Sequence, residues 1–262
     1  MAEPERAAPA PEADFPSDDL CRLGWRLRSV RLPDGRSELR EEPLTEGDLL
    51  DPQLGDHVIQ NSWHIATVYS LYDILSWRYE PRPDVFISSD LKMIWGILGL
   101  PDPAPDIAVI PGVRDKGRFR RSFKVRREGT RPALVLEVVS DEPEHQNADH
   151  HDKVAIYERA GVPEYLILDP PTPFGKACRW TGYRLNSAGR YETIPADAEG
   201  RLLSATTDLR FGVAPEGKSI QLVDAATGEL LLSSAEGRRK AEAELTRLRD
   251  ELDRLQGAFE TR

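Results

Sequence analysis

The sequence is poor in cysteine and has no long apolar run. Its 262 residues include only Cys21 and Cys178, which are too few for a disulfide framework, so we expect both thiols to be structural. No apolar stretch approaches the roughly 20 residues that a membrane-spanning helix requires. No charged-then-apolar signal segment opens the chain either. We therefore expect a protein of the reducing cytoplasm that makes no use of a membrane.

Basic charge is also in short supply, which limits how the chain could bind nucleic acid. The formal net charge is -10. Spread evenly, that charge would repel nucleic acid, so a nucleic-acid function requires a local basic patch. One such patch lies in residues 114–131, where nine basic residues stand against two acidic ones. Phe119 and Phe123 in the same stretch suit base stacking beside phosphate contacts. The plainer alternative is a solvated hairpin. The residues expected to contact DNA are Arg118, Arg120, Arg121, Lys124, Arg126 and Arg127.

The two ends of the chain differ from the middle in composition. Residues 1–19 are rich in Pro, Ala and acids with a single aromatic, which predicts a disordered tail. Residues 234–262 repeat apolar side chains at alternating spacings of four and three, which predicts a short coiled-coil helix and, most simply, a homodimer. The stripe consists of Ala241, Leu245, Leu248, Leu252, Leu255 and Phe259. The alternatives are a solitary helix or one folded back on its own sheet. Residues 20–233 remain as one domain.

Hydrophobic periodicity places strands and helices along that domain. Leu32-Pro33-Asp34-Gly35 is a turn tetrad between two strands of a hairpin, and residues 62–79 have helical spacing. We expect strands at 83–88, 107–110 and 133–139, a helix at 149–160, and a further strand after Pro163. Residues 92–100 could be strand or loop. Short alternating runs at 179–185, 190–194, 219–223 and 229–232 predict hairpins.

A glutamate stands in the middle of an otherwise apolar strand. Residues 133–139 are apolar on both alternating faces apart from Glu137, which is typical of a strand covered on both sides. An unpaired carboxylate in that position would cost several kcal/mol or would take up a proton. Lys153, on the helix that follows, lies beside apolar residues and can lean towards the sheet. Glu137 therefore needs a cation or a hydrogen-bond donor.

A second carboxylate, Asp106, precedes the strand at 107–110. Neighbouring strands lie about 4.8 Å apart, so Asp106 and Glu137 could hold one divalent ion between them. Two carboxylates and Lys153 beside such an ion suit phosphodiester hydrolysis, because the lysine can orient or deprotonate water and offset charge in the transition state. The plainer alternative makes Asp106 a turn residue and pairs Asp149 with Lys153 as a helix salt bridge worth about 0.3 kcal/mol.

Four segments in this order carry a family resemblance. They are PDIAVI, LVLEVVS, Asp149-x-x-x-Lys153 and YERAGVPEYLILDP. Over about residues 40–200 the chain resembles the Uma2 family of endonuclease-like proteins, a branch of the PD-(D/E)XK restriction-endonuclease-like superfamily. The resemblance implies an α/β (mixed α+β) fold in which a mixed sheet is flanked by helices.

The resemblance also implies roles for individual residues. Asp106 and Glu137 would be the metal ligands, with magnesium or manganese as the cofactor. The superfamily pattern places lysine two residues after the acidic one, where this chain has Val139. Lys153 would take its place from the next helix, as in other members of the family. His64 resembles the family's histidine near the N-terminal helix, and it could reach a phosphate or water.

The histidines His145, His150 and His151 raise the question of a zinc site. Neither cysteine is near them and their spacing matches no zinc site, which favours a polar loop and a helix start.

The sequence thus predicts a magnesium-dependent DNA endonuclease. The rival hypothesis is a degenerate nuclease fold that serves as a DNA-binding, protein-binding or assembly module. Metal binding through Asp106 and Glu137 distinguishes the two.

Overall fold

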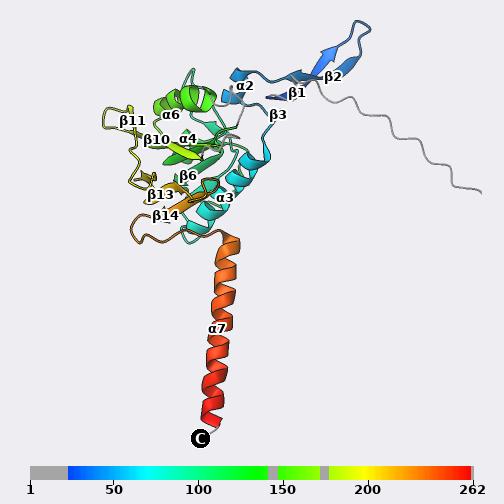
Figure 1. Cartoon of the computed structure of the whole chain (residues 1–262). Coiled ribbons are helices and arrows are strands. Elements are labelled where there is room, and N and C mark those ends of the chain that lie inside the picture. The colour runs from blue at the N-terminus through cyan, green and yellow to red at the C-terminus, as the bar shows by residue number, and fades with distance from the viewer. Residues whose placement is uncertain (1–22, 141–146, 172–176, 261–262) are drawn as a thin grey trace, which may run out of the picture. The chain divides into compact units, whose positions relative to one another are not determined.

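A computed structural model describes residues 23–140, 147–171 and 177–260 of the chain (Figure 1). The predicted tail at 1–19, Cys21 and His145 lie outside the described residues. The described chain forms two compact units. One contains the residues up to 45 together with 53–59, and the other contains 46–52 and the residues from 60 onward.

The first unit is a small antiparallel sheet. Its strands are β1 (Gly24–Arg31), β2 (Ser37–Pro43) and β3 (Asp56–Val58), in the order β2-β1-β3. The β1–β2 hairpin closes at the predicted tetrad, where the Gly35 N–H donates to the Leu32 carbonyl at 2.9 Å. Gly35 has a φ of 86°, a left-handed conformation that glycine adopts without strain. The hairpin prediction is confirmed.

The second unit is built on a six-stranded mixed sheet. Its strand order is β11-β10-β9-β8-β6-β4. Only β8 and β9 are parallel, and all other neighbours are antiparallel. The strands are β4 (Val85–Ser88), β6 (Ile107–Pro111), β8 (Leu134–Val138), β9 (Glu164–Asp169), β10 (Arg179–Leu185) and β11 (Tyr191–Thr193). The predicted mixed sheet is confirmed, and the strands predicted at 83–88, 107–110, 133–139 and 179–185 lie within a few residues of their predicted bounds.

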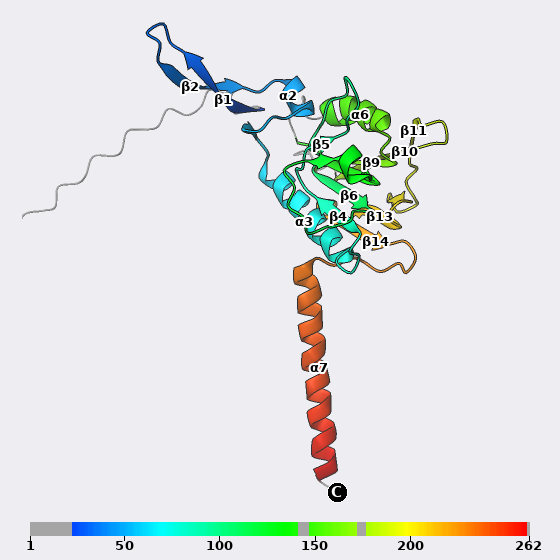
Figure 2. The same cartoon turned by 180° about the vertical axis from the view of Figure 1, so that it is seen from behind.

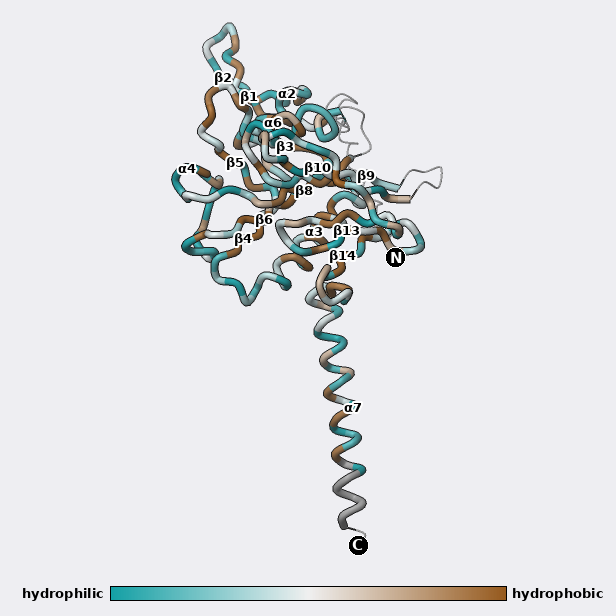
Figure 3. Tube along the Cα trace, turned by 90° about the vertical axis from the view of Figure 1, so that its left-hand side faces the viewer, coloured by the Kyte–Doolittle hydropathy of each residue, from teal (hydrophilic) through white to brown (hydrophobic). Residues whose placement is uncertain are grey.

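Helices cover both faces of this sheet (Figure 2). On one face, α3 (Ser62–Arg78) buries Leu71 and Leu75 against a core that includes Leu136. On the other face, α6 (Lys153–Ala160) packs Ile156 into a second core with Val135. The alternation of residues 135 and 136 between the two cores follows from the two-residue period of a strand. In Figure 3 the central strands β6 and β8 are coloured largely hydrophobic, as strands buried on both sides require.

Short elements complete the second unit. They are α2 (Glu46–Leu50), β5 (Met93–Ile94), β7 (Phe123–Lys124), α4 (Val125–Glu128), η1 (Ala148–Asp152), β12 (Leu202–Ser204), β13 (Leu209–Val213) and β14 (Ile220–Asp224). Residues 92–100, left open by the sequence, contain the two-residue β5 followed by a loop. The strand predicted at 229–232 is wrong, because Leu230 makes only an isolated bridge to Val223.

The last element is α7 (Ser234–Glu260). The backbone N–H of Ser234 donates to Asp73 of α3 at 2.7 Å, which fixes the first turn of α7. Leu245, Leu248 and Leu252 are 53%, 48% and 55% exposed. The helix prediction is confirmed, whereas the coiled coil stays a prediction. In the described part of the chain, no helix combines the length and apolar character needed to cross a membrane.

A buried carboxylate in the second unit ties the three-stranded sheet β12-β13-β14 to the six-stranded one. Glu164, at the start of β9, is fully buried. Its carboxylate accepts hydrogen bonds from the Ser204 hydroxyl at 2.5 Å, the Ala205 N–H at 2.9 Å and the Thr206 N–H at 3.1 Å. Arg184 on β10 donates to it at 2.6 Å. These bonds hold the turn after β12 against β9.

We expect Glu164→Ala to lower the free energy of unfolding by about 3 kcal/mol, because it leaves several buried donors without an acceptor. Urea denaturation followed by circular dichroism measures the change. Glu229→Ala, an exposed glutamate, is the matched control and should stay within about 0.5 kcal/mol of the parent. Equal stability of the two variants would contradict a structural role for Glu164.

Candidate active site

Strand pairing brings the two predicted carboxylates together. In the β6–β8 register Ile107 faces Leu136, and one further step places Asp106 opposite Glu137. The Asp106 N–H donates to Glu137 Oε2 at 3.3 Å, and the Val138 N–H donates to Asp106 Oδ2 at 2.7 Å. Both carboxylates are buried, with residue exposures of 6% and 1%. Each strand therefore orients the acid that the other carries.

Lys153 and Tyr157 meet Glu137 from α6. The two residues are four positions apart and so share one face of the helix. Lys153 Nζ lies 3.1 Å from Glu137 Oε1 and 2.8 Å from Asp149 Oδ1. The Tyr157 hydroxyl donates to Glu137 Oε1 at 2.6 Å. Lys153 therefore makes both of the contacts considered from the sequence. It forms the helix salt bridge with Asp149, and it also contacts Glu137 on the sheet.

The helix predicted at 149–160 begins with a π-turn, η1, rather than with α-helix. Wide turns of this kind are frequent at functional sites. The Tyr165 hydroxyl donates to the Asp149 carbonyl at 2.9 Å, and His150 Nε2 lies 2.6 Å from Asp169 Oδ1. These contacts anchor the turn to β9. Within the described ranges no group of three or more His, Cys, Asp or Glu has a metal-binding arrangement, and His150 is engaged by Asp169.

His64 reaches the acidic pair from the first turn of α3. The Asn61 side chain caps this helix by accepting from the His64 N–H at 2.8 Å, which sets the position of the ring. His64 Nε2 lies 3.3 Å from Asp106 Oδ1. Both ring nitrogens are buried, and neither has an aligned hydrogen bond with any described residue. Burial acts to lower the pKa of His64, but Asp106 outweighs it, and the pKa is raised overall.

The environment drives the pKa values of the two acids apart. Burial raises the pKa of Glu137 well above its usual range, against the attraction of Lys153 and with the help of Asp106 and Asp149. Burial acts on Asp106 too, but His64 and Lys153 outweigh it and lower its pKa. The pKa of Lys153 is raised, because the carboxylates of Asp149 and Glu137 outweigh its burial. Asp106 is therefore ionised and Lys153 protonated at neutral pH.

Sequence reasoning missed Asp90. In the β4–β6 register Ser88 faces Ala108, so the chain beyond β4 runs beside Asp106. The Asp90 N–H donates to the Pro105 carbonyl at 3.1 Å. Asp90 has a φ of 48°, which is uncommon for a residue other than glycine. Burial and the charge of Asp106 raise the pKa of Asp90 to about 6. No periodic pattern marks this position in the sequence, whereas Tyr157 was readable from its spacing to Lys153.

The site carries more acid than base. Lys153 and His64 face four carboxyl groups, those of Asp90, Asp106, Glu137 and Asp149. Magnesium is usually held by one or two carboxylates with water and substrate phosphate, rather than by a cage made only of protein groups. The opposed carboxylates of Asp106 and Glu137, with the unsatisfied His64 ring beside them, fit a hydrated ion of that kind.

The basic segment 114–131 divides into internal and exposed cations. Lys116 Nζ contacts three carbonyls in the turn after α3, the nearest being that of Glu80 at 2.6 Å. Arg131 donates to the Ala160 carbonyl at 2.9 Å. The Arg120 side chain is only 2% exposed and is paired with Glu128. Lys124, like Arg121, Arg126 and Arg127, is exposed.

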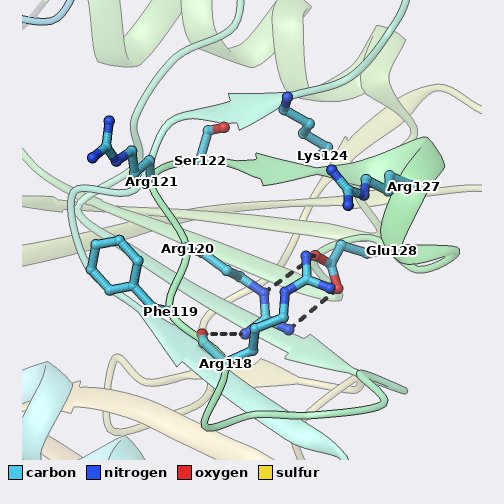
Figure 4. Close-up of a pocket in the computed structure, with 8 residues that line it drawn as sticks. All are labelled: Arg118, Phe119, Arg120, Arg121, Ser122, Lys124, Arg127 and Glu128. Atoms are coloured by element: carbon cyan, nitrogen blue, oxygen red, sulfur yellow. Dashed lines mark hydrogen bonds and ion pairs between the residues drawn. The ribbon is translucent and has the colours of Figure 1, made fainter.

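Phe123 is fully buried in the core, so the expectation that it stacks on bases is wrong. Its ring lies 6.4 Å from that of Phe86, in stacked orientation. Phe119 is 84% exposed. Figure 4 shows the residues that line a hollow in this segment, with the Arg118, Arg120 and Glu128 contacts dashed.

A mixed sheet flanked by helices, with an acidic pair on two antiparallel strands, is the architecture of the restriction-endonuclease-like class. The sequence model of the Uma2 family, described as "Putative restriction endonuclease", matches residues 31–221, and the chain belongs to this family. Membership of this family indicates a restriction-endonuclease-like nuclease.

Among solved structures, a "putative nuclease belonging to DUF820" from Anabaena variabilis ATCC 29413 is similar at 13% identity and a TM-score of 0.42. The match covers 68% of this chain and 82% of that chain. No curated protein matches the chain.

We expect Asp90→Asn to raise the melting temperature above about pH 6 and to leave it unchanged near pH 4. A carboxyl whose pKa rises from about 4 in the unfolded chain to about 6 in the folded one destabilises the fold once it ionises. Asparagine keeps the shape and tolerates the left-handed conformation. Thermal melts at both pH values measure the effect.

Asp208→Asn is the matched control, because Asp208, like Asp90, is exposed and has a positive φ, of 55°, but lies outside the site. An equal gain in melting temperature at pH 8 in both variants would contradict the expectation that the ionised Asp90 carboxylate destabilises the fold.

Proposed function

We propose that this chain is a magnesium- or manganese-dependent DNA endonuclease that hydrolyses phosphodiester bonds. The observation that carries the proposal is the pair of buried carboxylates, Asp106 and Glu137, opposed across two strands with Lys153 at 3.1 Å from the second. Buried acids with divergent pKa values and a cation partner are typical of catalytic sites. The metal would polarise the phosphate and acidify a bound water.

Lys153 acts as a cation rather than as a base. Its pKa is raised by Asp149 and Glu137, so it keeps its proton at neutral pH. A protonated lysine can orient the attacking water and offset the negative charge that develops on the phosphate in the transition state. Of the two roles that the sequence left open for Lys153, the electrostatics of the site support this one.

His64 and Tyr157 set the positions of the two acids. Tyr157 donates to the Glu137 oxygen that Lys153 also contacts, which keeps that carboxylate turned towards α6. The His64 ring lies beside the other acid, and its raised pKa favours the imidazolium. We propose that His64 contacts a phosphate oxygen or a water of the substrate complex.

The exposed cations of the basic segment are the proposed contacts to the DNA backbone. Arg118, Arg121, Lys124, Arg126 and Arg127 are exposed and lie on or beside β7 and α4. Arg120 holds the segment together from inside through Glu128. Phosphate contacts of this kind give affinity that falls as salt rises.

The remaining proposals concern organisation. We propose that residues 20–233 act as the nuclease domain, that the protein works in the cytoplasm, and that residues 234–262 form a coiled coil in a homodimer. Leucines about half exposed on α7 support the last proposal, because burying them against a second copy removes apolar surface from water.

We expect Lys153→Ala to reduce the rate of DNA cleavage about 100-fold while circular dichroism still shows a folded protein, because a charge that stabilises the transition state is lost. Cleavage of plasmid DNA with magnesium or manganese measures the rate. Lys218→Ala removes an exposed lysine elsewhere and should cut at the parent rate. An unchanged rate in Lys153→Ala would assign this residue to the helix salt bridge alone. Absence of cleavage by the parent on varied DNA would favour the binding-module hypothesis.

We expect light scattering to give a dimer for the full chain and a monomer for a chain that ends at Ser234. In the full chain, Leu248→Lys should also give a monomer, because it places a charge in the apolar seam, whereas Thr246→Lys beside the seam should stay dimeric. A monomeric parent would rule out self-association through α7.

A further inference from the structure

The hollow in the basic segment has a rigid floor. The Arg120 guanidinium lies 4.8 Å from the centre of the Phe86 ring and pairs with Glu128 at 3.2 Å. Arg118 reaches the same carboxylate at 2.6 Å. The Arg120 side chain is 2% exposed, so its contacts are shielded from water, whereas the Arg118 side chain is 48% exposed. Two cations share one acid here, which leaves the floor of the hollow positively charged.

The rim of the hollow adds exposed cations. Arg121, Lys124 and Arg127 line it, and none of them has a carboxylate partner among the residues that the structure describes. In the view of Figure 4, Arg121 lies to the left, Lys124 and Arg127 lie to the right, and Ser122 lies between them. The hollow measures about 210 Å³. The hollow is thus lined by cations and is smaller than the about 300 Å³ that a drug-sized ligand needs.

One wall of the hollow is an aromatic ring with no structural use. Phe119 is 84% exposed, so it contributes almost nothing to the core, unlike Phe123 four residues later. Burial of a phenylalanine side chain would stabilise a fold by about 2 kcal/mol, and this one forgoes that gain. An exposed ring beside unpaired cations is the arrangement on which unpaired bases stack while their phosphates meet positive charge.

We infer that this hollow binds an unpaired stretch of DNA, with a base stacked on Phe119 and neighbouring phosphates held by Arg121, Lys124 and Arg127. Bases inside a duplex are already stacked and cannot offer a face to the ring. The protein therefore favours DNA with a single-stranded overhang over blunt duplex. This inference rests on the proposed function only in taking DNA as the ligand.

Fluorescence anisotropy on the full-length protein tests the inference. The probes are a blunt duplex and the same duplex with an overhang of about 10 nucleotides, a length within the range of single-strand binding sites. Chelator in the buffer excludes cleavage. We expect tighter binding of the overhang DNA, and in Phe119→Ala about a tenfold loss of affinity for the overhang DNA with blunt duplex unchanged.

Matched variants separate stacking from general effects. Phe119→Trp keeps an aromatic ring and should retain the preference for the overhang, and Leu98→Ala removes another exposed apolar side chain, at 99% exposure, without effect. Equal binding of both probes by the parent, or equal losses on both probes in Phe119→Ala, would overturn the inference. Selective binding without any cleavage in a metal-supplemented assay would keep it and reject the nuclease proposal. Cleavage without selective binding would reject the inference about unpaired DNA and keep the nuclease proposal.

Discussion

The site depends on how the fold accommodates Glu137, a carboxylate at the centre of a strand that is covered on both sides. Without partners, such a group would be protonated or would destabilise the sheet by several kcal/mol. The structure supplies Lys153 at 3.1 Å, the Tyr157 hydroxyl at 2.6 Å and the backbone N–H of Asp106 at 3.3 Å. The strand order, the antiparallel β6–β8 pair and the helix that returns to β9 all serve to bring these three groups to one point.

The same neighbourhood is more acidic than a structural ion pair requires. A pair made for stability would balance its charges, whereas here burial and the charge of Asp106 raise the pKa values of both Glu137 and Asp90. Excess negative charge in a buried site destabilises the free protein and creates affinity for a cation. The wide turn of η1, held by the Tyr165 hydroxyl on the Asp149 carbonyl, adds a third acid beside Lys153.

Much of this site could be predicted from the sequence, because its central features are local. A lone acid in an apolar strand demands a partner, and the next helix offers only a few candidates. The parts that failed depend on tertiary contacts. Asp90 is placed in the site by the β4–β6 register and by its left-handed φ, and neither feature produces a periodic pattern in the sequence. The number of cations available to DNA in the basic segment was overestimated for the same reason. Lys116 binds backbone carbonyls and Arg120 binds the Glu128 carboxylate, so both are used within the fold. The short strands β12 and β13 also went unpredicted.

Calorimetric titration of manganese into the parent and into Glu137→Gln tests whether Asp106 and Glu137 share a cation, since the amide keeps the size of the side chain but removes its charge. We expect the parent to bind one ion per chain, Asp106→Asn and Glu137→Gln both to lose this binding, and Asp208→Asn outside the site to keep it. Equal binding by the parent and by Glu137→Gln would contradict a shared cation site at these two carboxylates.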